Sequence, residues 1–311
     1  MTAVRRAIIA TSVLALSATA CGSGGGTSED KSVRESVKVS GTFGEAPEIT
    51  IDAPLDVTES SSWVEEEGDG DTVGASATAI LELTLANGRT GKTAISTIDQ
   101  GRPLEVQLGD QVFPSLNTAL VGKPADSRIV VASTPDDAYG DSGSPQSGIE
   151  GGDSVVMVAD ILSTDPTSVL DGPTGDALAA PARAPRLKEK DGVPVRFGFA
   201  KARKPRKLTV IPLRKGTGPA IESPDRISAD YLGQVWNAKA PFGSTFAKEP
   251  SQFSIGLSGV IPAWDKALDG QKEGARVMII SPPELAYGST GQENIPANST
   301  LVFVVDVLGV G

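Results

Sequence analysis

One pattern of residues occurs twice in this chain, at nearly constant spacing. The first two matches have an offset of 148 residues and the third an offset of 146. The matching segments are Val112–Gly122 with Val260–Gly270, Ala138–Gly140 with Ala286–Gly288, and Ser154–Met157 with Thr300–Phe303. An ungapped register across separate elements predicts two similar domains in tandem. A length of 311 residues fits two domains of ordinary size.

In the second copy the pattern centres on a short helix. Pro262 fits the first position of a helix, because its φ is fixed and it has no N–H to satisfy. Trp264, Ala267 and Leu268 recur at helical spacing and therefore share one face. Gly270 can adopt the left-handed conformation that ends a helix. About two turns are too few for an independent helix, so this face must pack against a sheet.

Short alternating runs predict the strands of such a sheet, and Asn87-Gly88 marks a hairpin turn after one of them. In the first copy these runs are Ile49–Ile51, Ala79–Leu85, Leu104–Gly109 and Arg128–Val131.

Further motifs flank the short helix in a fixed order. They are Tyr231-Leu232-Gly233, Pro241-Phe242-Gly243, Phe253-Ser254-Ile255, Val260-Ile261-Pro262-Ala263-Trp264, Leu285-Ala286-Tyr287-Gly288, Ile295-Pro296 and Leu301-Val302-Phe303. As an ordered set, they resemble the FKBP-type peptidyl-prolyl cis-trans isomerases over about the last 110 residues.

The resemblance implies an α+β fold with two tandem FKBP-like domains, each an antiparallel β-sheet wrapped around one short α-helix. Residues 37–163 are expected to form a degenerate FKBP-like domain, and residues 191–311 the isomerase domain. Residues 164–190 join them; their Pro, Ala and Gly content predicts a semi-extended linker that is not packed.

The resemblance also implies a cleft that grips a prolyl ring. Its catalytic residues would be Tyr231, Phe242, Trp264, Tyr287 and Phe303, with Trp264 as the floor. Its substrate-binding residues would be Phe253, Val260, Ile261 and Ile295. The Ile261 N–H and the Tyr287 hydroxyl would bond substrate carbonyls. For Phe253, Val260 and Ile295, plain core packing is an equally good interpretation.

The two copies differ in their aromatic residues. Residues 22–170 contain four aromatic side chains and residues 190–311 contain ten. The Trp264 position is Leu116 in the first copy, and the Tyr231 position falls near Leu81. Leucine fills a core but supplies no aromatic face, so the first copy is expected to keep the fold without the site.

The second copy departs from the family at two positions. Gly243 stands where the family has an aspartate in a bend, and Gln292 stands where many relatives have histidine. We expect binding to survive both changes and turnover to be weaker.

The composition excludes several other kinds of chemistry. The chain has no histidine and one cysteine, so Ser-His-Asp and Cys-His catalysis and histidine-dependent metal sites are excluded. No metal or cofactor is expected. A net charge of −11 argues against nucleic acid as a partner. Rotation about a prolyl bond needs no proton transfer, and such a chain can perform it.

The N-terminus has the pattern of an exported lipoprotein. Residues 1–20 carry two arginines followed by an apolar run, which predicts a signal peptide too short to remain as a membrane span. The run ends in a lipobox-like sequence before Cys21, the expected lipidation site. Residues 22–36 would then form a flexible tether. This predicts a lipid-anchored protein on the extracytoplasmic face of the cell membrane.

Two segments concentrate charge. Residues 44–71 hold ten acidic residues and no basic one, which is typical of a solvated surface. Residues 183–207 hold ten basic residues and two acidic ones. Those basic residues either protect strand edges or contact an anionic partner, namely lipid head groups or the acidic first copy.

The leading hypothesis is a membrane-anchored isomerase that assists the folding of exported proteins. Its partners would be proline-containing polypeptides and macrolide-type inhibitors, the latter implied by the resemblance. The alternative is a non-catalytic chaperone or peptide-binding lipoprotein in which both copies bind. A third possibility is a structural lipoprotein whose domains only position partners.

Overall fold

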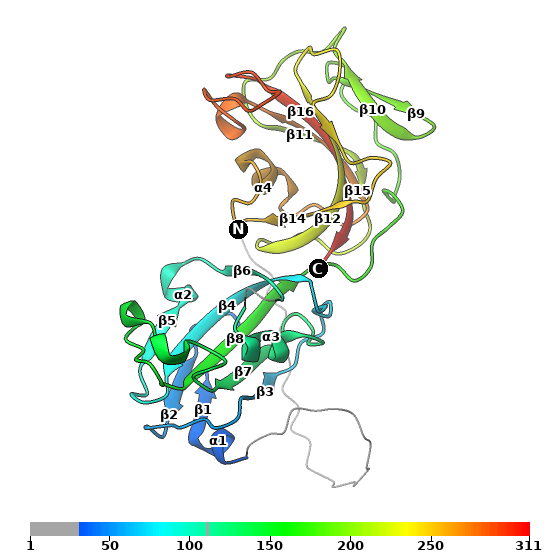
Figure 1. The fold of residues 1–311 in the computed structure, drawn as a ribbon. Helices are drawn as coiled ribbons and strands as arrows, with labels where there is room; N and C mark the ends of the chain where they lie inside the picture. Colours follow the sequence, from blue (N-terminus) through cyan, green and yellow to red (C-terminus); the bar gives the residue numbers. More distant parts are fainter. Residues whose placement is uncertain (1–30, 110–111) are drawn as a thin grey trace, which may run out of the picture.

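The computed structural model describes residues 31–109 and 112–311, which form two domains of the same topology (Figure 1). Each domain contains an antiparallel sheet of six strands in the same order, β3-β7-β8-β4-β5 in the first and β11-β15-β16-β12-β13 in the second. The sixth strand pairs with the long strand of its domain, β6 with β4 and β14 with β12. The predicted fold class is therefore confirmed. Among the described residues, no helix is long and apolar enough to span a membrane.

The first domain contains β3 (Ser61–Glu66), β4 (Thr78–Asn87), β5 (Thr93–Ser96), α2 (Thr97–Gln100), β6 (Leu104–Gln107), α3 (Pro114–Leu120), β7 (Arg128–Ser133) and β8 (Val155–Thr164). The second contains β11 (Thr209–Lys215), β12 (Asp225–Val235), β13 (Gly243–Ser244), β14 (Ser251–Ile255), α4 (Pro262–Leu268), β15 (Ala275–Ser281) and β16 (Leu301–Val310). Three turns of 3-10 helix lie at Gly140–Ser142, Pro145–Ser147 and Pro283–Leu285.

The strand register aligns the two domains residue by residue. Tyr231 pairs with Val305 in the second sheet, and Leu83 pairs with Ala159 in the first. The counterpart of Tyr231 is therefore Leu83, so the expectation of a position near Leu81 was two residues off. The two positions share a face because side chains in a strand alternate. The helix offset of 148 also holds in this strand.

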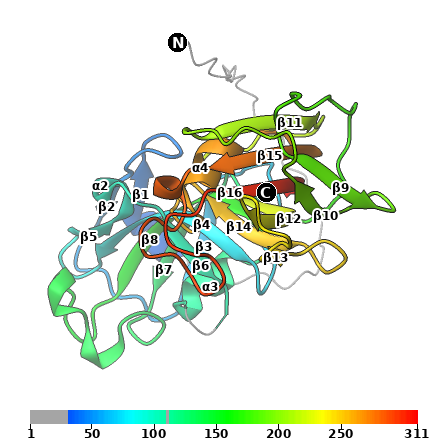
Figure 2. The ribbon, with the colours of Figure 1, turned by 90° about the horizontal axis from the view of Figure 1, so that it is seen from above.

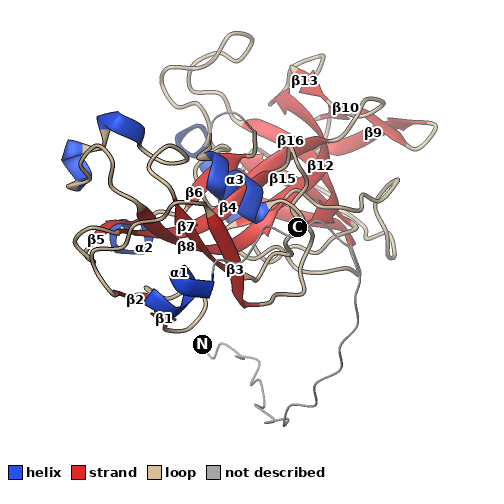
Figure 3. Cartoon of the chain, turned by 60° about the horizontal axis from the view of Figure 1, so that its bottom comes forward, coloured by secondary structure: helices blue, strands red, loops and turns tan. Residues whose placement is uncertain are grey.

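Each sheet is buried on both faces, which the sequence did not predict. On one face the short helix packs over an apolar cluster, α3 in the first domain and α4 in the second. The other face carries a second cluster under a two-stranded hairpin. These hairpins are β1 (Val37–Ser40) with β2 (Glu48–Ile51), and β9 (Arg186–Lys190) with β10 (Val193–Gly198). Figure 2 shows β9 and β10 on the side of the second sheet away from α4. Figure 3 shows how short the helices are beside the two sheets.

An equivalent ion pair fastens each hairpin. The buried Arg128 bonds both carboxylate oxygens of Asp160, at 2.6 and 2.7 Å. It also donates to three carbonyl oxygens in the loop between β1 and β2. At the same positions of the second sheet, Arg276 bonds Asp306 at 2.6 Å and reaches Glu189 in β9 at 2.5 Å. Arg128 thus satisfies loop carbonyls of the first hairpin, and Arg276 ties an exposed glutamate of the second hairpin to its sheet.

The start of the folded chain differs from the predicted tether. Residues 31–36 form α1 (Lys31–Ser36), and Val33 is 3% exposed in the same cluster as Trp63. A single apolar residue in a polar segment gives little sequence signal, which explains the difference. The predicted signal peptide, Cys21 and residues 22–30 lie outside the described residues.

The segment between the domains is docked, in contrast to the unpacked linker that was predicted. Backbone N–H groups of Leu170, Thr174 and Leu178 each donate to a carbonyl of the second domain at 2.8 Å. Residues 186–190 form β9. Pro and Gly composition predicts an extended backbone but does not show which free sheet edges such a backbone meets. The basic hairpin β9–β10 lies on the side of the second domain away from the first (Figure 1), so the acidic first domain is not its partner here.

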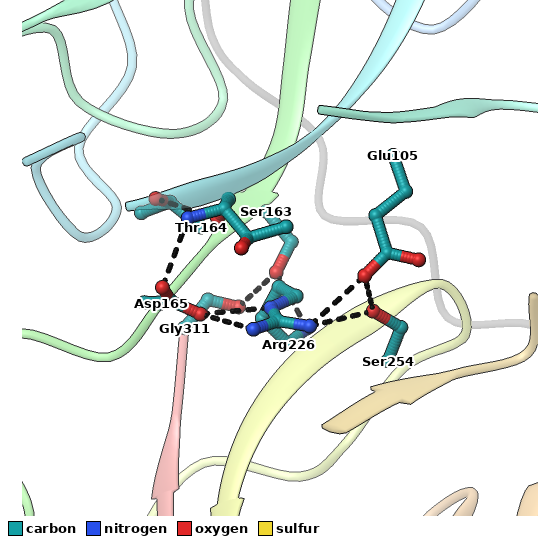
Figure 4. A network of polar contacts seen from close by, with 8 residues as sticks. Glu105, Ser163, Thr164, Asp165, Arg226, Ser254 and Gly311 are labelled. Carbon is teal, nitrogen blue, oxygen red and sulfur yellow. Dashed lines mark hydrogen bonds and ion pairs between the residues drawn. The ribbon is translucent and has the colours of Figure 1, made fainter. Parts of the chain in front are cut away.

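A network around Arg226 joins the two domains (Figure 4). Its guanidinium donates to Asp165 at 2.6 and 2.8 Å and to Glu105 in β6 at 3.0 Å. Glu105 also accepts a hydrogen bond from Ser254 in β14, at 2.5 Å. The Arg226 side chain is 8% exposed, so these bonds form in a largely desolvated setting. The contact brings β6 of the first domain against β14 of the second.

A group of carboxylates lies at the same boundary and makes stability depend on pH. Burial, and then the nearby charges of Glu222, Asp126 and Asp269, raise the pKa of Asp225 to about 7. The folded protein therefore holds this proton at a pH where the unfolded chain has lost it, and stability falls as pH rises from about 4 to about 7.

Asp225→Asn should remove this loss. We expect a free energy of unfolding about 1–2 kcal/mol higher than wild type at pH 8, after discounting for solvent access, and no difference at pH 4. Urea unfolding at the two pH values measures it. Asp176→Asn, at an exposed position, serves as the control. An equal effect of Asp225→Asn at both pH values would show that its charge is not the cause.

Candidate functional site

A cavity of about 460 Å³ opens between α4, β12 and β14 of the second domain. Eight of the nine residues predicted for the site line it: Tyr231, Phe242, Phe253, Val260, Ile261, Trp264, Tyr287 and Phe303. Gly259 and Pro262 complete the lining. The residues converge because β12, β14, β16 and the start of α4 meet at one end of the sheet.

Trp264 forms the floor of this cavity. It lies in the first turn of α4, is 4% exposed, and meets three rings edge-on: Tyr231 at 5.5 Å, Phe253 at 5.1 Å and Phe303 at 5.5 Å between centroids. Such edge-to-face pairs each contribute about 0.5–1.5 kcal/mol beyond their buried area. Asp265 holds α4 against the end of β14 by accepting the Gly256 N–H at 2.8 Å. The indole is thus fixed before any ligand binds.

Gly233 makes room for the opposite wall. A Cβ at this position would lie 2.4 Å from Phe242 and 2.9 Å from Phe303, so any side chain would displace both rings. Those rings meet at 5.8 Å between centroids. The sequence showed Gly233 only as part of the motif. Its signal is a glycine inside a strand, where close approach of another group is a common reason.

Two hydrogen-bond donors are free at the cavity. Within the described residues, neither the Ile261 N–H nor the Tyr287 hydroxyl has a hydrogen-bond partner. Burial and the neighbouring Tyr231 raise the pKa of Tyr287, which keeps its hydroxyl protonated and able to donate. The indole Nε1–H of Trp264 is also buried without a partner among the described residues. The cavity therefore offers apolar walls with a few donors, the usual composition of a ligand site.

Gly243 sits beside this site in the bend after Phe242. Its φ is not in the left-handed region, and a Cβ there would lie 3.5 Å from the Tyr231 hydroxyl, an ordinary contact distance. The bend is held to β12 because the Tyr231 N–H donates to Thr245 Oγ1 at 2.8 Å. An aspartate at this position would therefore be sterically tolerated.

Ile295 is the one predicted site residue that does not line the cavity. It is 7% exposed and packs in the apolar cluster beneath α4. Its backbone forms a bridge with Gln292, which closes the loop after Tyr287. Ile295 therefore supports the loop that carries Tyr287, in agreement with the core-packing interpretation.

The first domain has a cavity of about 430 Å³ at the equivalent place. The register puts Leu83, Val106 and Leu116 at the positions of Tyr231, Phe253 and Trp264. Leu85 stands at the position of Gly233, and Ala94 at the position of Phe242. The large residue is therefore on β4 in the first domain, whereas in the second domain it is the one that faces β12. The first copy thus lacks the aromatic residues at the first three of these positions, as expected, but a cavity of similar volume remains there.

A family model described as FKBP-type peptidyl-prolyl cis-trans isomerase matches residues 64–158 and 218–308, one region in each domain. The FKBP-type peptidyl-prolyl cis-trans isomerase FkpA of Escherichia coli K12 is 41% identical over 95 residues, which are 30% of this chain and 34% of FkpA. FK506-binding protein 4 of Gibberella zeae is 34% identical over 139 residues, 45% of this chain and 26% of that protein. The matched parts thus span about a quarter to a third of these curated relatives.

Similar solved structures include the three FKBP domains of wheat FKBP73, which match 81% of this chain and 94% of that chain at 18% identity and a TM-score of 0.33. The crystal structure of FkpA from Escherichia coli matches 36% of this chain and 54% of that chain, at 35% identity and a TM-score of 0.32.

Proposed function

Because the chain belongs to the family of FKBP-type peptidyl-prolyl cis-trans isomerases, we propose that its second domain catalyses rotation about Xaa–Pro bonds in the cavity floored by Trp264. The observation that carries the proposal is the set of three aromatic rings fixed edge-on around a buried indole. Such walls would hold a compact, apolar prolyl ring in one place.

The chemistry needs no proton transfer and no covalent intermediate. Rotation about the bond faces a barrier of about 18–20 kcal/mol, because the planar amide is stabilised by resonance. The twisted amide is less polar than the planar one, so an apolar cavity favours it relative to water. The Ile261 N–H and the Tyr287 hydroxyl, both from residues that line the cavity, would hold substrate carbonyls while the bond rotates.

A protease-coupled assay with a proline-containing peptide tests the proposal on the full chain. We expect activity that a macrolide ligand of this family abolishes. Peptide binding without any rate enhancement would instead favour the alternative, a non-catalytic chaperone or peptide-binding protein. Gly243, which replaces the family's aspartate, is the observation that favours this alternative.

We further propose that the protein is anchored to the extracytoplasmic face of the membrane by a lipid on Cys21, where it acts on exported, proline-containing polypeptides. The support is the sequence: an apolar run after two arginines, and the chain's single cysteine at its end. Acyl chains contribute about 0.8 kcal/mol of membrane affinity for each buried CH₂, so two or more of them anchor a protein stably.

Cys21→Ala should move the protein from the membrane to the soluble fraction without changing the stability of either domain. The reason is that Cys21 precedes residue 31, where the described fold begins. Fractionation after a high-salt wash measures the location, and thermal unfolding is the control. A variant that stays on the membrane would assign the attachment to another segment, with the basic hairpin β9–β10 the first to test.

Gly243→Asp should raise kcat about tenfold and leave KM nearly unchanged. The new carboxylate would lie within reach of the Tyr231 hydroxyl, which has no hydrogen-bond partner among the described residues. It would orient this donor near the rotating amide, and about 1.4 kcal/mol gained only in the twisted state gives tenfold. Gly243→Asn, which keeps the shape without the charge, is the matched control. An unchanged rate with an unchanged melting temperature would show that the carboxylate is dispensable.

A further inference from the structure

We propose that the cavity of the first domain is a second binding site, which takes an aliphatic side chain of an extended polypeptide and does not require proline. The cavity has nearly the volume of the prolyl cavity, about 430 against about 460 Å³. It lies at the same place in the same topology, between α3, β4 and β6. The first domain therefore keeps a ligand-sized hollow where its counterpart binds.

The lining determines what this cavity can hold. Leu83, Val106 and Leu116 replace three aromatic residues, so no flat ring faces remain on those sides to stack on a prolyl ring. Leu104 is 39% exposed at its edge, one of few large apolar side chains exposed in the described chain. Phe113 is the aromatic residue in the lining, and most of the other apolar residues are branched aliphatic ones. Such walls favour an aliphatic side chain, because burial of apolar area supplies the binding free energy without directional contacts.

A backbone donor is placed for an extended chain. Phe113 immediately precedes Pro114 at the start of α3, as Ile261 precedes Pro262 in the second domain. Within the described residues the Phe113 N–H has no hydrogen-bond partner. Like the Ile261 N–H, it can donate to a carbonyl of a bound polypeptide. The site thus combines an apolar pocket with a main-chain contact.

The position of the cavity identifies the occupant. Glu105, which lines it, bonds Ser254 and Arg226 of the second domain. Ser254 is the neighbour of Phe253, a wall of the prolyl cavity. The strands β6 and β14 lie next to each other across the domain boundary (Figures 1 and 2). An unfolded polypeptide held by its proline in one cavity therefore has the other within reach. This choice of occupant rests on the proposed function, whereas the pocket itself does not.

The test measures binding of a fluorescent, proline-free peptide, in which leucines alternate with serines between terminal lysines, to the full chain carrying Cys21→Ala. We expect binding that persists when a macrolide saturates the second domain. Leu104→Asp should weaken binding at least tenfold. Val121→Asp, at a residue 37% exposed in the same domain but outside the cavity, should not. Complete displacement by the macrolide would overturn the proposal.

A second variant guards against misfolding. Val106→Phe introduces the residue that the second domain carries at the same position, so the fold tolerates it there, and its larger ring would take up part of the volume that an aliphatic ligand side chain needs. Wild-type affinity in both Leu104→Asp and Val106→Phe would overturn the proposal. So would a dimer of the wild-type chain that Leu104→Asp abolishes, because a second copy would then be the occupant.

A separate measurement tests whether one polypeptide occupies both cavities at once. A longer peptide that carries both a prolyl residue and the leucine segment should bind more tightly than either part, since the second contact becomes intramolecular. No gain in affinity for any spacing between the two parts would overturn the proposal that one polypeptide occupies both cavities. Loss of isomerase activity together with intact binding of the proline-free peptide would contradict only the proposed function.

Discussion

Replacing Trp264 with leucine, the residue at the equivalent position of the first domain, should lower kcat/KM for prolyl peptides about a hundredfold. The change removes the floor of the cavity and three edge-to-face ring contacts. A hundredfold loss corresponds to about 2.7 kcal/mol, within the roughly 1.5–3 kcal/mol that contact with one large buried apolar side chain supplies; the three ring contacts act by holding the indole in place for the substrate. Macrolide affinity, measured by calorimetry, should fall in parallel because the same surface is lost.

Trp236→Leu is the matched control. Trp236 belongs to the same domain and meets Phe199 at 5.0 Å between centroids, but it does not line the cavity. We expect it to leave kcat/KM within about twofold of wild type, since it touches no substrate. Equal losses in the two variants would mean that Trp264 acts through the stability of the domain and not through contact with the prolyl ring.

Arg128→Met should lower the free energy of unfolding of the first domain by about 3–5 kcal/mol, the usual cost of breaking a buried ion pair from one side. The Arg128 side chain is 2% exposed, as is that of Asp160, which would be left as an unpaired buried charge. Three carbonyls between β1 and β2 would also lose their donor. Hydrogen exchange in urea, resolved by domain, measures the effect.

Two further variants define the cause. Arg128→Met combined with Asp160→Leu should recover much of the loss, because no buried charge remains. Arg276→Met should act on the second domain instead and leave the first unchanged. Since Arg276 is 12% exposed, its effect should be smaller. A double variant as unstable as Arg128→Met alone would assign the loss to the loop carbonyls.

The helix and the aromatic site could be predicted because their signals are local and chemically specific. Pro262 starts the helix and Trp264 faces inward, as periodicity required. The ordered motifs then brought eight site residues together correctly. Ile295 shows the limit of this reasoning: a motif residue can support a loop that carries a site residue without reaching the cavity itself.

Other features depend on contacts that no local pattern contains. The docking of the interdomain segment needs free carbonyls supplied by β11, by β16 and by Gly274 before β15. The counterparts of Tyr231 and Phe253 in the first cavity, Leu83 and Val106, can be identified only once the strands are in register. Burial on both sheet faces did leave a trace, since Leu301–Leu308 is almost continuously apolar instead of alternating.

The strand order has a consequence for how the protein is made. In each sheet a middle strand is the last of its domain to be synthesised: β8 lies between β7 and β4, and β16 between β15 and β12. Earlier strands have no central partner until residues 155–164 or 301–310 emerge. Each domain therefore gains its sheet in a late, cooperative step, because the pairings that close it are long-range. A ribosome or translocation pore thus meets each domain as an unfolded chain, and the first domain can complete its sheet while the second is still emerging.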